Sequence, residues 1–349
     1  MNTTGRNIRL TTFGESHGAA IGGIIDGFPS NVRIDLEAVQ AELDRRRPGQ
    51  SHITTGRQEA DRVRVLSGML DGVTTGAPIG FIIENTNQRS GDYEEMAHVF
   101  RPSHADFTYE AKYGIRDYRG GGRASARETA TRVVGGAFCK QLLAEHGIRI
   151  EAWTQQVGHV EMKEATTDPE SNAVRCPDSE AAARMIELIE QVKAEGDTIG
   201  GIVGCKISGV PAGVGEPHFD RLNARLGSAM FSIPAVKGVE FGMGFAGCSR
   251  RGSEVIDEFT TDAEGRIVTK TNHSGGIQGG LSNGMDIELR VGFKPVATLL
   301  REVNTVTCAG EPTVLKARGR HDACVVPRAV PVVEAMAALT IADFIFGVR

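Results

Sequence analysis

The chain has 349 residues, of which 40% are hydrophobic and 24% are charged, and its formal net charge is -5. This composition predicts a globular protein and excludes collagen-like and low-complexity chains, while the acidic balance argues against general nucleic-acid binding. Six widely spaced cysteines include no zinc-binding spacing, so we expect reduced, mostly buried thiols and no metal site. Without an apolar leader or a long uninterrupted apolar segment, the sequence predicts a cytoplasmic chain with no membrane partner.

Two apolar runs near the N-terminus, residues 8–13 and 19–25, predict strands separated by a short polar turn. The turn carries Ser16 and His17 between glycines. A histidine displayed between two strands is well placed for acid–base chemistry. The alternative is an exposed imidazole in an ordinary turn.

Asp35 is predicted to cap a helix whose apolar residues repeat at helical spacing and which ends at Arg45, Arg46 and Arg47. Cations in the last turn of a helix favour its dipole, which is a structural reason for an arginine here. Three adjacent arginines exceed what this interaction requires. We therefore expect at least one of them to contact an anionic ligand.

Residues 79–84 predict a buried strand, and residues 89–122 are the least hydrophobic long region of the chain. Long irregular regions inside a domain are usually functional or mobile. This region contains Arg101, His104 and Asp106. Asp106 could orient the imidazole of His104 for acid–base chemistry, or both side chains could be solvated.

Residues 119–128 contain three consecutive glycines followed by a charged segment that predicts the start of a helix. Ser125 and Glu128 have the spacing of a capping box. A helix start behind glycines suits an anion, and the alternative is a glycine-rich surface turn with solvated arginines. The arginines that could add bidentate donors to this anion site are Arg119, Arg123 and Arg127.

The rest of the chain alternates short apolar runs with helical patterns and a second glycine-rich run at residues 272–280. That run could bring backbone amides to a phosphate or a planar ring, or it could be a tight turn. Asp322 could cap the last helix, pair with an arginine or serve as a base. The predicted strands here are residues 148–157, 199–210 and 285–291, and the predicted helices are residues 178–195, 222–230 and 326–346.

Three long stretches resemble, in order, the three signatures of the chorismate synthase family. They are residues 14–29 (GESHGAAIGGIIDGFP), 120–138 (GGGRASARETATRVVGGAF) and 320–336 (RHDACVVPRAVPVVEAM). Shorter blocks are also similar to that family, and the resemblance covers nearly the whole chain. These blocks are residues 44–49 (DRRRPG), 100–106 (FRPSHAD), 208–217 (SGVPAGVGEP) and 272–280 (NHSGGIQGG).

The resemblance implies a carbon–oxygen lyase that acts on phosphates, at the last step of the shikimate pathway to aromatic amino acids. The implied reaction converts 5-enolpyruvylshikimate 3-phosphate to chorismate and phosphate by an anti-1,4-elimination. It would require reduced FMN without net redox change, with NADPH as a possible reductant. The family also implies one α+β domain over residues 1–349, a sandwich of helices and antiparallel β-sheets, assembled as a homotetramer.

The resemblance also implies roles for individual side chains. His104 would protonate the departing phosphate, and His17 would lie near the flavin and protonate or balance its anionic reduced form. Asp322 would help the flavin N5 to remove the C6 proton. The implied substrate or NADPH contacts are Arg46, Arg101 and Arg127. The implied FMN contacts are Arg123, Ala124, Ser125, Pro234, Ala235, Gly279, Lys294, Pro295, Val296, Ala297, Thr298 and Arg320.

Two rival functions follow from the same residues. A serine hydrolase could use Ser16 and His17, but adjacent residues of one turn rarely face each other and GESHG is not a G-x-S-x-G elbow. A non-catalytic flavin- or phosphate-binding protein is the second alternative, and it should tolerate alanine at His17, His104 and Asp322.

His52 stands where many bacterial relatives carry an arginine, which weakens the expectation of a cationic contact there.

Overall fold

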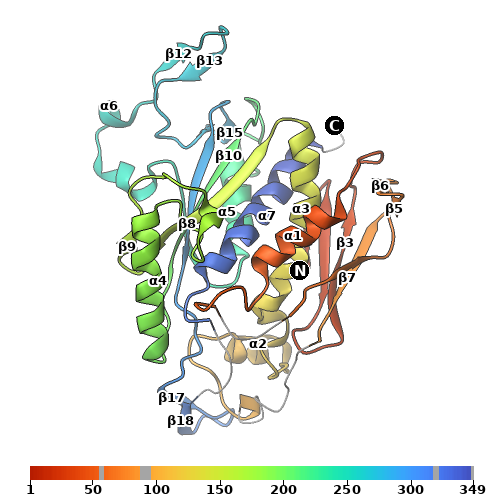
Figure 1. Ribbon diagram of the computed structural model, residues 1–349, viewed down its shortest axis with the longest axis vertical. Helices are drawn as coiled ribbons and strands as arrows, with labels where there is room; N and C mark the ends of the chain where they lie inside the picture. Colours follow the sequence, from red (N-terminus) through yellow and green to blue (C-terminus); the bar gives the residue numbers. More distant parts are fainter. Residues whose placement is uncertain (55–58, 87–95, 317–321, 347–349) are drawn as a thin grey trace.

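A computed structural model describes residues 1–54, 59–86, 96–316 and 322–346. The described part contains two five-stranded antiparallel sheets with helices packed between them (Figure 1). The predicted α+β sandwich of helices and antiparallel sheets is therefore confirmed.

The first sheet has the strand order β1-β2-β3-β7-β4. Alternation along β3 turns Ile21 and Ile25 inward to the helices. Between them, a Cβ on Gly22 would lie 2.5 Å from the ring of Phe13, so only glycine allows this ring to cover the strand. The strands of this sheet are β1 (Thr3–Thr4), β2 (Arg9–Gly14), β3 (Ala20–Asp26), β4 (Val63–Val65) and β7 (Ile79–Glu84).

The second sheet has the strand order β11-β16-β10-β8-β9. Val203 in its centre pairs with Val291 on one side and Thr154 on the other, and all three are buried. The inner face of this sheet is therefore apolar and available for helix packing. Its strands are β8 (Arg149–Val157), β9 (Val160–Glu161), β10 (Gly201–Ser208), β11 (Val236–Phe241) and β16 (Ile287–Phe293).

Four helices fill the space between the sheets, and α7 contacts the other three as well as β8 and β10. At Gly136 a Cβ would lie 2.3 Å from Ala335, so the missing side chain lets α3 and α7 approach closely. Because α7 is surrounded on all sides, its long apolar sequence is part of the core, and the predicted helix at residues 326–346 is confirmed. The four helices are α1 (Leu36–Arg46), α3 (Thr129–Glu145), α5 (Leu222–Phe231) and α7 (Val326–Ile345).

The remaining elements lie around this sandwich. Figure 1 shows the β12–β13 hairpin projecting at one end, and α2 with the β17–β18 hairpin at the other. Helix α4 packs against β8 and β9. The bounds are α2 (Asp106–Tyr113), α4 (Ser179–Ala194), α6 (Gly252–Val255), β5 (Met69–Leu70), β6 (Val73–Thr74), β12 (Phe259–Thr261), β13 (Ile267–Thr269), β14 (Ile277–Gln278), β15 (Leu281–Ser282), β17 (Glu302–Val306) and β18 (Pro312–Lys316).

The predicted capping box at Ser125 and Glu128 is wrong in detail. Ser125 caps the 3₁₀-helix Ala126–Glu128 by accepting a hydrogen bond from the backbone of Arg127. Helix α3 starts only at Thr129, and the Glu128 carboxylate accepts hydrogen bonds from Thr12 and Arg132 instead. The glutamate is therefore committed to tertiary contacts and cannot close the box.

Three further properties of the described part bear on function. None of the helices in the described part combines the length and apolar character that a membrane span requires. All six cysteines are free thiols, and burial raises the pKa of Cys139 and Cys205 well above the ordinary value. Within the described ranges, no group of three or more histidine, cysteine, aspartate or glutamate side chains is arranged to hold a metal ion.

Candidate active site

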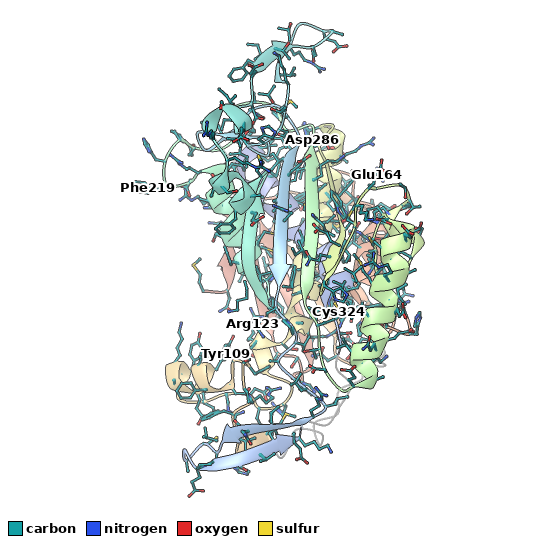
Figure 2. All side chains as sticks on the ribbon, turned by 90° about the vertical axis from the view of Figure 1, so that its left-hand side faces the viewer. Tyr109, Arg123, Glu164, Phe219, Asp286 and Cys324 are labelled. Atoms are coloured by element: carbon teal, nitrogen blue, oxygen red, sulfur yellow. The ribbon has the colours of Figure 1, made fainter. Side chains whose placement is uncertain are left out.

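A cavity of about 610 Å³ lies where the first turns of α3 and α7 meet α2. Its wall includes Thr129 at the start of α3, Val325 before the start of α7, and Tyr109 of α2. Figure 2 shows Arg123 at this end of the sandwich, close to Tyr109. Two helix N-termini direct their positive ends to one cavity, which favours an anionic ligand.

Most of the predicted site residues come together in this cavity, although they lie far apart in the sequence. Those that line it are His17, Arg46, Arg101, His104, Arg123, Ala124, Ser125, Arg127, Pro234, Ala235, Lys294, Val296, Ala297, Thr298 and Asp322. Gly279 and Pro295 are not among the lining residues. Arg320 lies outside the described residues.

Two of the three consecutive glycines, Gly120 and Gly121, pack against histidine rings. A Cβ on Gly120 would lie 2.3 Å from Cε1 of His17, and a Cβ on Gly121 would lie 2.9 Å from Cε1 of His104. Both glycines have positive φ, at 65° and 91°. These two glycines therefore bring the backbone close against His17 and His104.

Asp106 fixes the orientation of His104. Its Oδ1 lies 2.9 Å from Nδ1 of the histidine, and its two oxygens accept hydrogen bonds from Nε and Nη2 of Arg101, both at 2.7 Å. Burial opposes ionisation of Asp106, but the hydrogen bonds from Arg101 and His104 outweigh it and hold its pKa far below the ordinary value. An ionised Asp106 can only accept, so His104 donates through Nδ1 and keeps Nε2 for the cavity.

Ser16 and His17 face each other, contrary to the sequence-based expectation for adjacent turn residues. The Ser16 hydroxyl lies 3.1 Å from Nδ1 of His17, and both side chains are buried. The backbone N–H of Ser16 donates to the Gly122 carbonyl, which joins this turn to the glycine-rich segment. The contact sets the direction of the imidazole, which lines the cavity.

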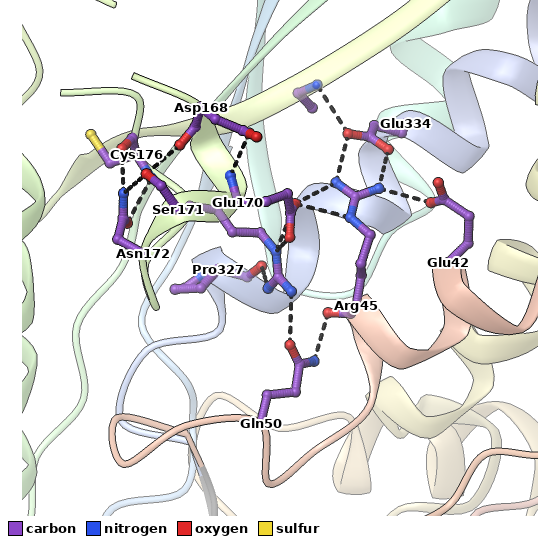
Figure 3. Close-up of polar contacts among 12 residues, drawn as sticks. Glu42, Arg45, Gln50, Asp168, Glu170, Ser171, Asn172, Cys176, Pro327 and Glu334 are labelled. Atoms are coloured by element: carbon purple, nitrogen blue, oxygen red, sulfur yellow. Dashed lines mark hydrogen bonds and ion pairs between the residues drawn. The ribbon is translucent and has the colours of Figure 1, made fainter. Parts of the chain in front are cut away.

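Of the three arginines at the end of α1, only Arg46 lines the cavity. It donates to Asp61 Oδ2 at 2.7 Å and to the Thr129 hydroxyl at 3.2 Å. Arg45 points away to the buried carboxylate of Glu334, as Figure 3 shows. Of the three arginines, Arg46 is therefore the one that is placed to contact a ligand in this cavity.

Arg127 and Arg123 approach the cavity from the segment after the glycines. Arg127 donates to Asp61 Oδ1 and to Asn85 Oδ1. Arg123 donates to the Thr12 hydroxyl at 2.7 Å. Arg119 is not a lining residue and pairs with Asp117 near the surface, so its predicted part in the anion site is not supported.

Asp322 stands before α7 and forms an ion pair with Arg328. The residue before the helix start is Val325, so Asp322 pairs with an arginine and does not cap the helix. Arg328 also donates through Nε to the backbone carbonyl of Arg46 at 3.0 Å. Arg328 thereby connects the carboxylate to the arginine-rich wall.

Lys294 adds a further cation to the wall. Burial and the charge of Lys237 lower the pKa of Lys294, so a bound anion would be a favourable neighbour. Two other lining residues, Ser103 and Ala235, have positive φ of 60° and 72°. Residues other than glycine are held in this conformation where the surrounding structure fixes them, which is common at functional sites.

Several lining residues were not identified from the sequence. Arg132 and Arg328 are presented by the first turns of α3 and α7, and Arg328 lies inside one of the family-like stretches. Asp61 is behind the wall, and no motif marks it. Gly279, in contrast, occupies the turn between β14 and β15, where the position that a Cβ would take has no packing neighbour within 4 Å.

Comparisons with known proteins find relatives over nearly the whole chain. A family model described as chorismate synthase matches residues 8–346. The chorismate synthase of Bacteroides fragilis is 59% identical over 348 residues, covering 98% of this chain and 97% of that protein. That of Cytophaga hutchinsonii is 54% identical over 351 residues, with 98% and 97% covered. A crystal structure of chorismate synthase superposes with a TM-score of 0.78 at 32% identity, covering 98% of this chain and 92% of that one. The chain therefore belongs to the chorismate synthase family.

Proposed function

We propose that the chain converts 5-enolpyruvylshikimate 3-phosphate to chorismate and phosphate by an anti-1,4-elimination, with reduced FMN bound in the same cavity. The observation that carries this proposal is the convergence of His17, His104, Asp322 and several arginines on one cavity. The reaction breaks a C–O bond to a phosphate and a C–H bond on the same ring, so it needs an acid, a base and cations for the anionic groups. The relatives named chorismate synthase favour this enzyme over a non-catalytic flavin- or phosphate-binding protein.

The cavity has the volume and the donor set that a flavin phosphate and an anionic substrate require. Its volume of about 610 Å³ lies within the range of roughly 300–1,000 Å³ that is common for small-molecule sites. Arginines and Lys294 supply cationic donors, while Ile233, Pro234 and Val332 supply apolar wall for a planar ring. When bound, reduced FMN supplies electron density to the substrate as the C–O bond breaks.

The residues that would hold FMN are small or cationic. Arg123 and Lys294 provide charge for its phosphate, and Ser125 and Thr298 provide hydroxyl donors. The small side chains of the remaining candidates let the backbone approach. These candidates are Ala124, Pro234, Ala235, Val296 and Ala297, with Pro295, Gly279 and Arg320 as further predicted contacts.

His104 is the proposed acid for the leaving phosphate. Because Asp106 binds its Nδ1, a proton on Nε2 can be delivered to a phosphate oxygen in the cavity. Arg101 shares the same carboxylate, so the acid and one predicted phosphate ligand are held in a fixed relation. Loss of negative charge at the oxygen that leaves makes phosphate a better leaving group.

His17 and Asp322 are the side chains proposed to take part in proton transfer and charge balance near the bound flavin. His17 holds a proton that can balance an anionic ligand, and Ser16 fixes the direction of its ring. Asp322 is held by its ion pair with Arg328 and is the carboxylate proposed to assist removal of the C6 proton. Arg46, Arg101 and Arg127 bind the phosphate and carboxylates of the substrate, or NADPH when it serves as reductant.

Anaerobic turnover with reduced FMN tests the proposal. Wild type should form chorismate and release phosphate, and His104→Ala should lose roughly 10²- to 10⁴-fold in kcat while it still binds FMN. His159→Ala, at an exposed histidine outside the cavity, is the matched control and should keep full activity. A wild type that binds FMN and substrate without releasing phosphate would instead support a non-catalytic binding protein.

Three finer expectations also belong to this proposal and rest on the family resemblance: a cytoplasmic location, a homotetramer and NADPH as a possible reductant. We further propose that residues 1–349 form a single domain. In support, one hydrophobic cluster runs from Leu10 in the first sheet through α3 and α7 to Val291 in the second. Gel filtration with light scattering measures the oligomeric state directly.

A further inference from the structure

We propose that Asp61 is a positioning residue of this active site, a carboxylate behind the cavity wall that holds the guanidinium groups of Arg46 and Arg127 as one anion-binding unit. Both arginines line the cavity, and Asp61 is not among its lining residues. The inference rests on the proposed function, because the unit is useful only if the cavity binds the phosphate and carboxylates of the substrate.

Asp61 uses a different carboxylate oxygen for each arginine. Oδ2 accepts a hydrogen bond from Nη1 of Arg46 at 2.7 Å, and Oδ1 accepts one from Nη1 of Arg127. All three side chains are almost completely buried. Two guanidinium groups so far from water repel each other, and a carboxylate between them offsets the repulsion with two attractive contacts.

The remaining hydrogen bonds fix each guanidinium plane and leave donors for a ligand. Arg46 also donates to the Thr129 hydroxyl and the Ala126 carbonyl, and Arg127 also donates to Asn85 and to the Glu84 carbonyl. A guanidinium group has five N–H donors, so at most two remain on each arginine. Removing the shared carboxylate would free both groups to change direction, although their other bonds remain.

The backbone of Asp61 is held in an unusual conformation by the helix that carries Arg46. Its φ is 44°, in the left-handed region that aspartate and asparagine tolerate better than most residues. Gln40 of α1 donates to the Asp61 carbonyl at 3.2 Å and accepts from the Val63 backbone N–H at 3.1 Å. Helix α1 thus positions both Arg46 and the carboxylate that binds it.

The charges around Arg46 predict how removal of the Asp61 carboxylate would change the pH dependence of anion binding. The charged groups that act on it are Asp61, Arg328 and Arg127, and Glu59 lies in the same cavity wall. Burial lowers the pKa of Arg46 to about 9. The charge of Asp61 acts to raise this pKa, whereas the charges of Arg328 and Arg127 lower it further. Without the Asp61 charge, Arg46 would lose its proton at a lower pH and bind anions less well as the pH rises.

Calorimetric titration of 5-enolpyruvylshikimate 3-phosphate into the flavin-free protein, with steady-state turnover in parallel, tests the inference. Asp61→Asn removes the charge but keeps the shape and the tolerance of positive φ. We expect Kd to rise about 10- to 100-fold and kcat/KM to fall by at least as much. The affinity of the variant should also decline more steeply than that of the wild type between pH 7 and pH 9.

Asp343→Asn is the matched control, since Asp343 is a buried carboxylate that pairs with Arg225 outside this cavity. It should lower thermal stability without changing the pH profile of substrate binding. If Asp61→Asn fails to fold, Gln40→Ala loosens the same carboxylate while keeping its charge, and it should raise Kd about 2- to 10-fold. Unchanged or tighter binding with unchanged kcat, in whichever variant folds, overturns the positioning role. No binding to wild type overturns the proposed function itself.

Discussion

Glycine at positions 120 and 121 is required by the histidines beside it. The space that a Cβ would occupy at Gly120 is filled by Cε1 and Nδ1 of the His17 ring, at 2.3 and 2.5 Å. A methyl group there cannot be accommodated unless the ring moves, since contacts under 3 Å between such atoms are strongly repulsive. The glycine-rich segment therefore sets the position of two proposed catalytic side chains.

Gly120→Ala should lower kcat roughly 10- to 100-fold, because it displaces the His17 imidazole from its place in the cavity. It should also reduce the free energy of unfolding by about 1–2 kcal/mol, since alanine is strained at a φ of 65°. Turnover assays and urea denaturation of the same preparations measure both effects.

Gly147→Ala is a control for Gly120→Ala, because it introduces backbone strain without displacing the His17 ring. Gly147 has a similar φ of 74°, and no atom lies within 4 Å of the position of a Cβ. This variant should show the same loss of stability, about 1–2 kcal/mol, with kcat unchanged. Equal kcat values for Gly120→Ala and Gly147→Ala would contradict the assignment of His17 to the proton chemistry.

Among the elements, a buried ionic network holds the end of α1 against α7. Glu334 of α7 accepts two hydrogen bonds from Arg45, at 2.7 and 3.0 Å (Figure 3). It also accepts one from Lys140 of α3 and one from the Ala152 backbone of β8. This network ties three helices and the second sheet together. Arg46, the next residue along α1, is thereby held at the cavity wall.

Glu334→Gln should reduce the free energy of unfolding at pH 7 by about 3 kcal/mol, because it removes the buried carboxylate that Arg45 and Lys140 share and leaves them the more exposed Glu42. Denaturant titration measures this. Asp197→Asn, which breaks the exposed pair of Asp197 and Arg301, should change stability by no more than about 0.5–1 kcal/mol. A similar loss in both variants would mean that burial does not strengthen the network.

The same carboxylate should contribute to acid sensitivity. Burial opposes ionisation of Glu334, but Arg45 and Lys140 outweigh it and hold its pKa below the ordinary value. A carboxyl with a lowered folded-state pKa stabilises the protein above its unfolded pKa of about 4.3, and this stabilisation is lost as the pH falls through the folded value. Below about pH 4, the unfolding free energy should therefore fall more steeply in wild type than in Glu334→Gln.

Local patterns predict elements well where periodicity and caps agree. The predicted helix after Asp35 is confirmed, with the Asp35 side chain accepting the expected backbone hydrogen bonds. The predicted helix at residues 178–195 is also confirmed, and Asp178 caps it in the same way. Helix α2, in contrast, was missed because its eight residues have no side-chain cap and little apolar periodicity. The Glu128 error has another origin, since its tertiary contacts with Thr12 and Arg132 override the local capping pattern.

The sequence predicts those site residues that lie in recognisable motifs. His17, His104 and Arg46 stand beside glycines, prolines or other arginines that draw attention to them. Asp61 has no such neighbours, and its importance depends on two arginines that only the fold brings to it. Long-range pairing of this kind has no local sequence signal.

At the scale of the whole molecule, the cavity is assembled from almost the full length of the chain. Its wall includes His17 beside the first sheet, Arg127 before α3, Lys294 at the end of the second sheet and Arg328 on α7. These segments share one hydrophobic cluster, whose burial is the main source of stability. A ligand in the cavity would therefore contact segments of both sheets and of the helices, which share this hydrophobic cluster.

Substrate binding should accordingly stabilise the chain as one cooperative unit. At a concentration of 100 times Kd, 5-enolpyruvylshikimate 3-phosphate should raise the free energy of unfolding by about 2.7 kcal/mol in flavin-free protein. Calorimetric scans should show one transition that moves upward with ligand concentration. Shikimate 3-phosphate, which lacks the enolpyruvyl carboxylate, should give a smaller shift at equal concentration because fewer arginine contacts form. Two transitions, of which only one responds to the substrate, would contradict the single domain, since parts that unfold separately cannot share the stabilisation of a common ligand.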